Sequence, residues 1–116
     1  NIENAIHWFE KAARLGHVKA LNRLGSIYDK GVHIKQDYKK AYYYSKQASL
    51  RGNVDATYRI GKMYEKGHGV DESLEKAHRY YRSAAAANHK EACYSLVYFY
   101  LHGIGTEKSK IDAYIL

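Results

Sequence analysis

Apolar residues recur along this chain at the spacing of amphipathic helices. Residues 5–16 place them at i, i+3, i+4, i+7 and i+8 from Ala5, and residues 20–28 place them on one face that begins at Ala20 and ends at Tyr28. Both spacings are typical of helices with one apolar stripe. Apolar and polar residues do not alternate with period two over any length, so we predict an all-α fold. We refer to segments like 20–28 as helix A and segments like 5–16 as helix B.

Both patterns repeat every 36 residues without insertion or deletion. The ladders are Ala5, Ala41, Ala77 and Ala113; Trp8, Tyr44, Tyr80 and Leu116; Ala12, Ala48 and Ala84; Gly16, Gly52 and Asn88; Ala20, Ala56 and Ala92; Tyr28, Tyr64 and Tyr100; and Gly31, Gly67 and Gly103. Such periodicity is typical of repeat proteins, in which stacked units bury a face that one unit cannot bury alone. We predict a solenoid of antiparallel helix pairs, with the apolar ladders, Trp8 included, in its core.

Turn and capping residues support the same division. Gly16, Gly52 and Asn88 follow helix B, where a left-handed residue is favoured, and the glycines of the last ladder close helix A. Three residues are suited to the N-cap of helix B, namely Asp37, Ser73 and Ser109.

The repeat predicts a single array over residues 1–116. We assign residues 1–18 to helix B of a preceding unit, 19–54 to unit 1, 55–90 to unit 2 and 91–116 to a truncated unit 3. Because the pattern begins and ends out of phase, we expect a section of a longer array. Apolar faces at both ends then allow end-to-end self-stacking.

Composition narrows the class of protein. Hydrophobic residues make up 46% of the chain, which is too apolar for a disordered protein, and there is no proline. The longest uninterrupted run of large apolar residues covers only residues 96–101, so we expect no membrane insertion. The sequence shows no targeting segment and does not indicate a compartment.

The net charge of +7 raises the question of nucleic-acid binding. The surplus is spread evenly over the three repeats, and Lys39–Lys40 is the only adjacent basic pair. Phosphate binding favours a clustered stripe, so we expect no specific nucleic acid. A basic surface that binds nucleic acid or acidic ligands remains the alternative function, and a mild attraction to acidic partners follows in either case.

Residues 56–88 resemble the Sel1-like repeat, whose pattern is A-x-x-x-L-G-x-x-Y-x-x-G-x-G-V followed by D-x-x-K-A-x-x-Y-x-x-A-A-x-x-G. The matches in this unit are Ala56, Ile60, Gly61, Tyr64, Gly67, Gly69, Val70, Lys76, Ala77, Tyr80, Ala84 and Ala85. His33 and Val97 stand where the pattern has glycine. The 36-residue step favours this family over the tetratricopeptide repeat, whose period is 34.

The resemblance implies a right-handed α/α superhelix with helix A on the concave side, and an adaptor or scaffold function in protein–protein interaction. Cysteine-rich members of the family have been associated with penicillin binding. They carry paired cysteines, and this chain has only Cys93, so that property is not transferred.

Positions of helix A that lie between the ladders vary from unit to unit, and variable positions carry specificity in repeat proteins. We predict that a peptide or partner protein binds there, on Asn22, Arg23, Ser26, Asp29, Tyr58, Arg59, Lys62, Glu65, Tyr94, Ser95, Tyr98 and Leu101. Tyrosine and arginine are enriched in interface hot spots. The alternative is that Tyr58, Tyr94 and Tyr98 pack between neighbouring A helices. We expect charge reversal at Arg59 and Lys62 to weaken binding without unfolding the protein.

No residue pattern indicates catalysis, a cofactor or a metal. None of the seven histidines has the spacing of a zinc-binding helix, and we expect them on the surface or at helix caps. The G-x-G loops at 67–69 and 103–105 follow no strand and are expected to be turns. Cys93 lies beside the Ala92 ladder, so we expect a buried, inert thiol.

Overall fold

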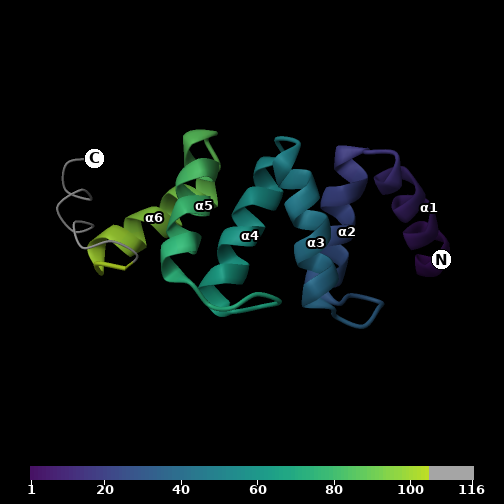
Figure 1. Ribbon diagram of the computed structural model, residues 1–116, viewed down its shortest axis with the longest axis horizontal. Coiled ribbons are helices and arrows are strands. Elements are labelled where there is room, and N and C mark those ends of the chain that lie inside the picture. Colours follow the sequence, from purple (N-terminus) through teal and green to yellow (C-terminus); the bar gives the residue numbers. More distant parts are fainter. Residues whose placement is uncertain (105–116) are drawn as a thin grey trace.

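The computed structural model describes residues 1–104, and six helices follow one another along its long axis (Figure 1). They are α1 (Ile2–Arg14), α2 (Val18–Lys30), α3 (Tyr38–Leu50), α4 (Val54–Lys66), α5 (Leu74–Ala86) and α6 (Lys90–Leu101). No strand forms between residues 1 and 104. The prediction of an all-α solenoid is confirmed, with α2, α4 and α6 as helices A and α1, α3 and α5 as helices B. The predictions for Ser109, Ala113 and Leu116 lie outside the described residues.

Local sequence sets the helix boundaries as expected. Asp37 and Ser73 cap α3 and α5, because their side chains accept from the backbone N–H three residues later, at 3.1 Å in each case. Gly16, Gly52 and Asn88 have φ values of 83°, 91° and 69°. His33 also has a positive φ, 68°, and so adopts the conformation for which the repeat pattern has glycine.

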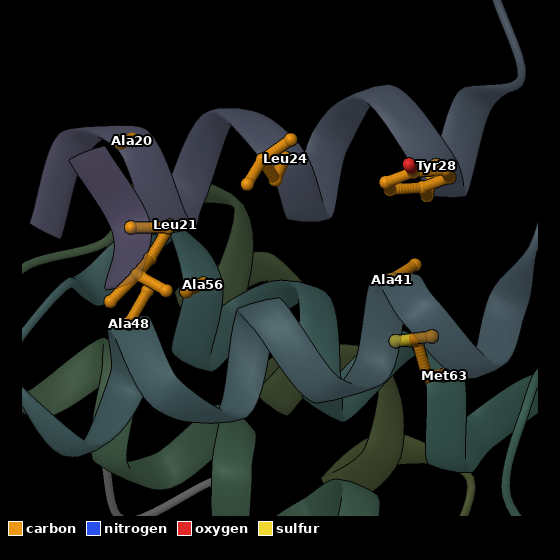
Figure 2. Packing of buried hydrophobic residues seen from close by; sticks show 9 residues of the cluster. Ala20, Leu21, Leu24, Tyr28, Ala41, Ala48, Ala56 and Met63 are labelled. Carbon is orange, nitrogen blue, oxygen red and sulfur yellow. The ribbon is translucent and has the colours of Figure 1, made fainter. Parts of the chain in front are cut away.

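The core lies between consecutive helices and is built from the ladders. Figure 2 shows Leu24 and Tyr28 of α2 above Ala41 of α3 and Met63 of α4. Ala41 is fully buried, and its small side chain lets helix axes approach closely. A second cluster joins α5 to α6 through Ala77, Tyr81 and Phe99.

The core prediction is wrong for Trp8. Its side chain is 61% exposed, although its repeat counterparts Tyr44 and Tyr80 are half-buried. Those tyrosines stack on Tyr28 and Tyr64, which belong to the helix that precedes their own. Within residues 1–104, α1 packs closely only on α2, so Trp8 has no such neighbour.

Candidate functional site

The A helices share one face of the solenoid, and an open groove runs across it. Its volume is about 710 Å³. We call it the first-helix groove; it is lined by Lys19, Asn22, Arg23, Ser26, Asp29, Lys30, Asn53, Asp55, Tyr58, Arg59, Lys62, His89 and Glu91. Residues of α2 and α4 form most of it, and the start of α6 closes one end.

The structure gathers the residues predicted to bind a partner into two hollows. The first-helix groove contains Asn22, Arg23, Ser26, Asp29, Tyr58, Arg59 and Lys62. A hollow of about 270 Å³ contains Glu65, Tyr94, Ser95 and Tyr98, together with Phe99. Leu101 is 43% exposed and lines neither. The predicted stripe is thus divided between two hollows, with Leu101 outside both.

Arg59 is the residue of this set most engaged with the protein itself. Its Nη1 donates to the Ser45 hydroxyl of α3 at 3.1 Å. Burial lowers the pKa of the guanidinium, and the nearby carboxylates of Asp29 and Asp55 oppose that shift. Arg59 therefore stabilises the contact between repeats and is only partly available to a ligand.

Tyr58 is likewise packed within the solenoid. Its ring stacks on His89 with 4.5 Å between centroids, and it lies 5.5 Å from the ring of Tyr81. Tyr58 therefore packs against neighbouring helices, which is the alternative to partner binding stated for it above. Tyr94 and Tyr98 differ, because they are 68% and 55% exposed.

Charges of both signs line the first-helix groove. Five basic side chains and three carboxylates face it, so it is mildly positive. Arg23 and Lys62 are exposed and form no ion pair with any carboxylate in residues 1–104. These two cations are therefore accessible to a partner.

The sequence reasoning missed the groove residues that precede or begin the A helices. Asn53 caps α4 by accepting from the Ala56 N–H at 2.8 Å, and His89 caps α6 through Nδ1 at 3.2 Å. The His89 Nε2 also lies 3.0 Å from Asp55 Oδ1. A signal was present, because His17, Asn53 and His89 stand 36 residues apart, and all three prove to be N-caps.

Two expectations about reactive side chains are wrong. Cys93 is exposed, because its position on α6 points away from the buried Ala92 ladder. His78 is buried rather than superficial, and its ring lies 5.3 Å from Tyr100 and 6.5 Å from Phe99. Over residues 1–104, His, Cys, Asp and Glu form no group of three that could hold a metal ion. No helix in this range is long and apolar enough to cross a membrane.

Paired antiparallel helices with a 36-residue step and a shared groove define an α-solenoid of the helix-hairpin class. The Sel1 repeat family model matches residues 1–17, 18–53, 54–89 and 90–116, so the chain belongs to the Sel1 repeat family. Sel1 repeats generally act as scaffolds for protein interaction and are typically non-catalytic. No curated protein sequence matches the chain at a significant level.

Solved structures show the same fold. A protective antigen of uropathogenic Escherichia coli superposes with a TM-score of 0.89 and 30% identity, over 93% of this chain and 23% of that one. A Sel1 repeat protein from Oxalobacter formigenes superposes with a TM-score of 0.84 and 29% identity, over 94% of this chain and 44% of that one. Cysteine-rich protein B of Helicobacter pylori superposes with a TM-score of 0.73 and 25% identity, over 80% of this chain and 70% of that one. The chain thus spans less than half the length of the first two.

Proposed function

We propose that this chain is a protein–protein interaction module, without catalytic activity, that receives an extended peptide or a helix of a partner protein on the A-helix face. The observation that carries the proposal is the first-helix groove. It is solvent-open, has a volume of about 710 Å³, and is lined by positions that differ between repeats. Residues that vary on a constant framework are those that set specificity in a solenoid.

The contacts within the groove divide its residues between support and recognition. Arg59 and Tyr58 are tied to Ser45 and His89, so they hold the groove in shape. Arg23 and Lys62 are exposed cations, and Tyr94 is an exposed aromatic side chain on the next A helix. Tyrosine and arginine contribute strongly at interfaces, and Lys62 adds an exposed positive charge, so we expect a partner to contact these three side chains.

Site-specific photocrosslinking tests the proposal. A photoreactive phenylalanine analogue replaces Tyr94, and a second protein carries it at Arg82, an exposed residue of α5 outside the groove. We expect the Tyr94 probe to trap one partner in cell extract and the Arg82 probe not to trap it. Equal yields from both positions would contradict binding at the A-helix face.

Charge-reversed variants give an independent measurement with the identified partner. Arg23→Glu with Lys62→Glu should weaken binding by at least about tenfold, because two exposed cations are lost from the groove. The matched control is Lys35→Glu with Arg82→Glu, which makes the same change in net charge outside it. The control should change affinity by less than about twofold.

The alternative function, a basic surface that binds nucleic acid or acidic ligands, makes a different prediction for salt. Phosphate contacts release counterions, so binding would fall steeply as ionic strength rises. Binding centred on Tyr94 would change far less. Retention of the trapped partner after nuclease treatment and at high salt supports the protein-interaction proposal.

A further inference from the structure

A second groove lies on the other side of the solenoid, between the B helices α3 and α5. Its volume is about 410 Å³, and α4 forms its floor. We call it the second-helix groove; it is lined by Lys46, Ser49, Thr57, Tyr64, Lys76, Arg79, Tyr80 and Ser83. Neither the variable positions of helix A nor the proposed partner surface includes any of these residues.

Aromatic rings hold two of the cations in place. Lys46 Nζ donates to the Tyr80 hydroxyl at 2.6 Å and lies 5.3 Å from the centre of that ring. Lys76 Nζ lies 5.4 Å from the ring of Tyr64, which itself stacks on Tyr80 at 5.6 Å. The hydrogen bond to Tyr80 positions Lys46 and the cation–π contact with Tyr64 positions Lys76, and neither contact neutralises the charge of the lysine.

No carboxylate lines this groove. Lys46, Lys76 and Arg79 therefore concentrate three positive charges, and none of them forms an ion pair with an acidic side chain of residues 1–104. Like charges that share a hollow repel one another, and a bound anion removes that repulsion. The Tyr64 and Tyr80 rings stack on each other and Lys76 lies against Tyr64, so both rings are already engaged within the protein.

The preceding repeat contains the equivalent groove and serves as an internal comparison. Between α1 and α3 it is lined by Glu10, Ala13, Arg14, Leu21, Tyr43, Tyr44, Gln47 and Arg51. A shift of 36 residues places Glu10 at the position of Lys46 and Tyr43 at that of Arg79. The framework thus accepts an acid and an aromatic residue at these two positions. Lys46 and Arg79 are therefore features of that groove and not requirements of the fold, whereas Lys76 has an equivalent in Lys40, which lies 5.2 Å from the ring of Tyr28.

We propose that the second-helix groove binds a phosphate monoester. A phosphate monoester carries close to two negative charges and three acceptor oxygens. Arg79 offers the planar fork that matches such a group, Lys46 and Lys76 supply further charge, and Ser83 adds a hydroxyl donor. The floor residues Ser49 and Thr57 are hydrogen-bonded to each other at 2.6 Å, so they shape the groove without reaching the ligand.

This site is separate from the surface proposed for a protein partner, so either proposal can be wrong while the other holds. The phosphate could belong to a free small molecule or to a phosphorylated side chain of another protein. Both present the same chemistry to the groove. The test therefore begins with inorganic phosphate and O-phosphoserine and then compares a phosphoserine peptide with a sugar phosphate.

Titration of isotope-labelled chain followed by NMR is the direct test. We expect inorganic phosphate and O-phosphoserine to give saturable shifts confined to backbone amides of α3 and α5 near the groove, and acetate at equal ionic strength to give none. The double variant Lys46→Glu, Arg79→Tyr introduces the residues that the preceding repeat already carries, so it should fold. Its affinity for phosphate should fall at least about tenfold, because charge-assisted hydrogen bonds are lost.

The matched control is Lys19→Glu with Arg23→Tyr, which changes net charge equally in the first-helix groove. It should alter phosphate affinity by less than about twofold. Absence of saturable shifts in the wild-type chain would overturn the proposal. An equal loss in both variants would show general charge attraction and would also overturn it, as would acetate binding as tightly as phosphate.

Discussion

The guanidinium of Arg59 passes directly over the backbone of Gly25 to reach the hydroxyl of Ser45. A Cβ atom at residue 25 would lie 2.9 Å from Arg59 Nη1 and would also meet Ser45 Oγ and, at 3.3 Å, the Ser45 backbone nitrogen. The glycine is therefore required by close approach, since its φ is not in the left-handed region. One side chain from α4 thereby packs over Gly25 of α2 and bonds to α3.

One repeat later the large and small partners exchange places. Tyr81 occupies the position of Ser45, Ser95 that of Arg59, and Gly61 that of Gly25. The Tyr81 hydroxyl donates to Glu65 at 2.6 Å, and Ser95 also lies within hydrogen-bonding reach of it. The space above the glycine is thus filled mainly by Tyr81 of α5 in one repeat and by Arg59 of α4 in the other.

We predict that Gly61→Ala destabilises the protein, although alanine is the better helix former by up to about 1 kcal/mol. The added Cβ would lie 2.7 Å from Tyr81 Cδ1 and Cε1, in a ring that is 1% exposed and cannot move aside. Overpacking of this kind costs roughly 1–3 kcal/mol, so the net effect is a loss. Urea unfolding measures it. In a Tyr81→Leu background the cost should fall to about half or less, and an unchanged cost would contradict the steric explanation.

Arg59→Glu and Lys62→Glu should differ sharply in stability. At Arg59 the new carboxylate would be half-buried near Asp29 and Asp55 and would lose the bond to Ser45, which should cost about 2–3 kcal/mol. Lys62 is exposed, so its reversal should change the free energy of unfolding by about 0.5 kcal/mol or less. Thermal melts followed by circular dichroism compare them. Similar melting temperatures would restore the expectation, drawn from the sequence, that both residues serve binding alone.

The fold was predictable because most positions of the repeat occur three times in the sequence, so a recurring apolar pattern stands out. Ala41, Ala48, Ala56 and Ala77 are fully buried, as the ladders indicated. Burial was not predictable where a position depends on a neighbouring unit. Trp8 has the same ladder position as Tyr44, but no helix in residues 1–104 packs on its outer side.

The candidate site was only partly predictable, because the sequence places residues on a helix face but does not reveal which of them are tied down. Tyr58, Arg59 and Tyr94 looked equivalent in the helical pattern. In the structure they differ, because Arg59 bonds to Ser45 and Tyr58 stacks on His89. Tyr94, in contrast, is 68% exposed. The second-helix groove was missed because its cations come from two different helices, with Lys46 on α3 separated by 30 residues from Lys76 on α5, so the sequence does not show them as one cluster.

His17 should behave as a replaceable cap. Its Nδ1 accepts from the Ala20 N–H at 3.4 Å, a long bond, whereas Asn53 makes the equivalent bond at 2.8 Å. We expect His17→Ala to lower the free energy of unfolding by about 1 kcal/mol and His17→Asn to leave it equal or higher. Urea midpoints at constant slope measure both. A loss with asparagine as large as with alanine would show that His17 contributes by something other than capping.

Cys93 should react in the folded protein. It is exposed on α6, and a thiol that needs no unfolding to meet a reagent is modified at close to the rate of a free thiol. We expect Ellman's reagent to titrate one thiol per chain without denaturant, with a rate that urea raises by less than about threefold. A large acceleration in urea would mean that the thiol is protected in the native state.

Tyr81 should make stability fall in alkaline solution. Burial, with the hydrogen bond to Glu65, raises the pKa of Tyr81 above its ordinary value of 10.0. The folded state therefore keeps the phenol neutral while the unfolded chain ionises. The stabilisation is complete below about pH 10 and is lost progressively as pH rises further, by up to about 1.4 kcal/mol per pH unit. Urea unfolding between pH 8 and 11, with tyrosinate absorbance as the second signal, measures this slope.

Tyr81→Phe should reduce the alkaline slope, because phenylalanine has no proton to lose. It should also cost about 1 kcal/mol at neutral pH through loss of the bond to Glu65. Tyr43→Phe is the control, since that side chain is 59% exposed and should leave the slope unchanged. Equal slopes in the wild-type chain and in Tyr81→Phe would show that another group governs alkaline unfolding. The natural second variant is then Tyr42→Phe, because burial and the bond to Tyr64 also raise the pKa of Tyr42.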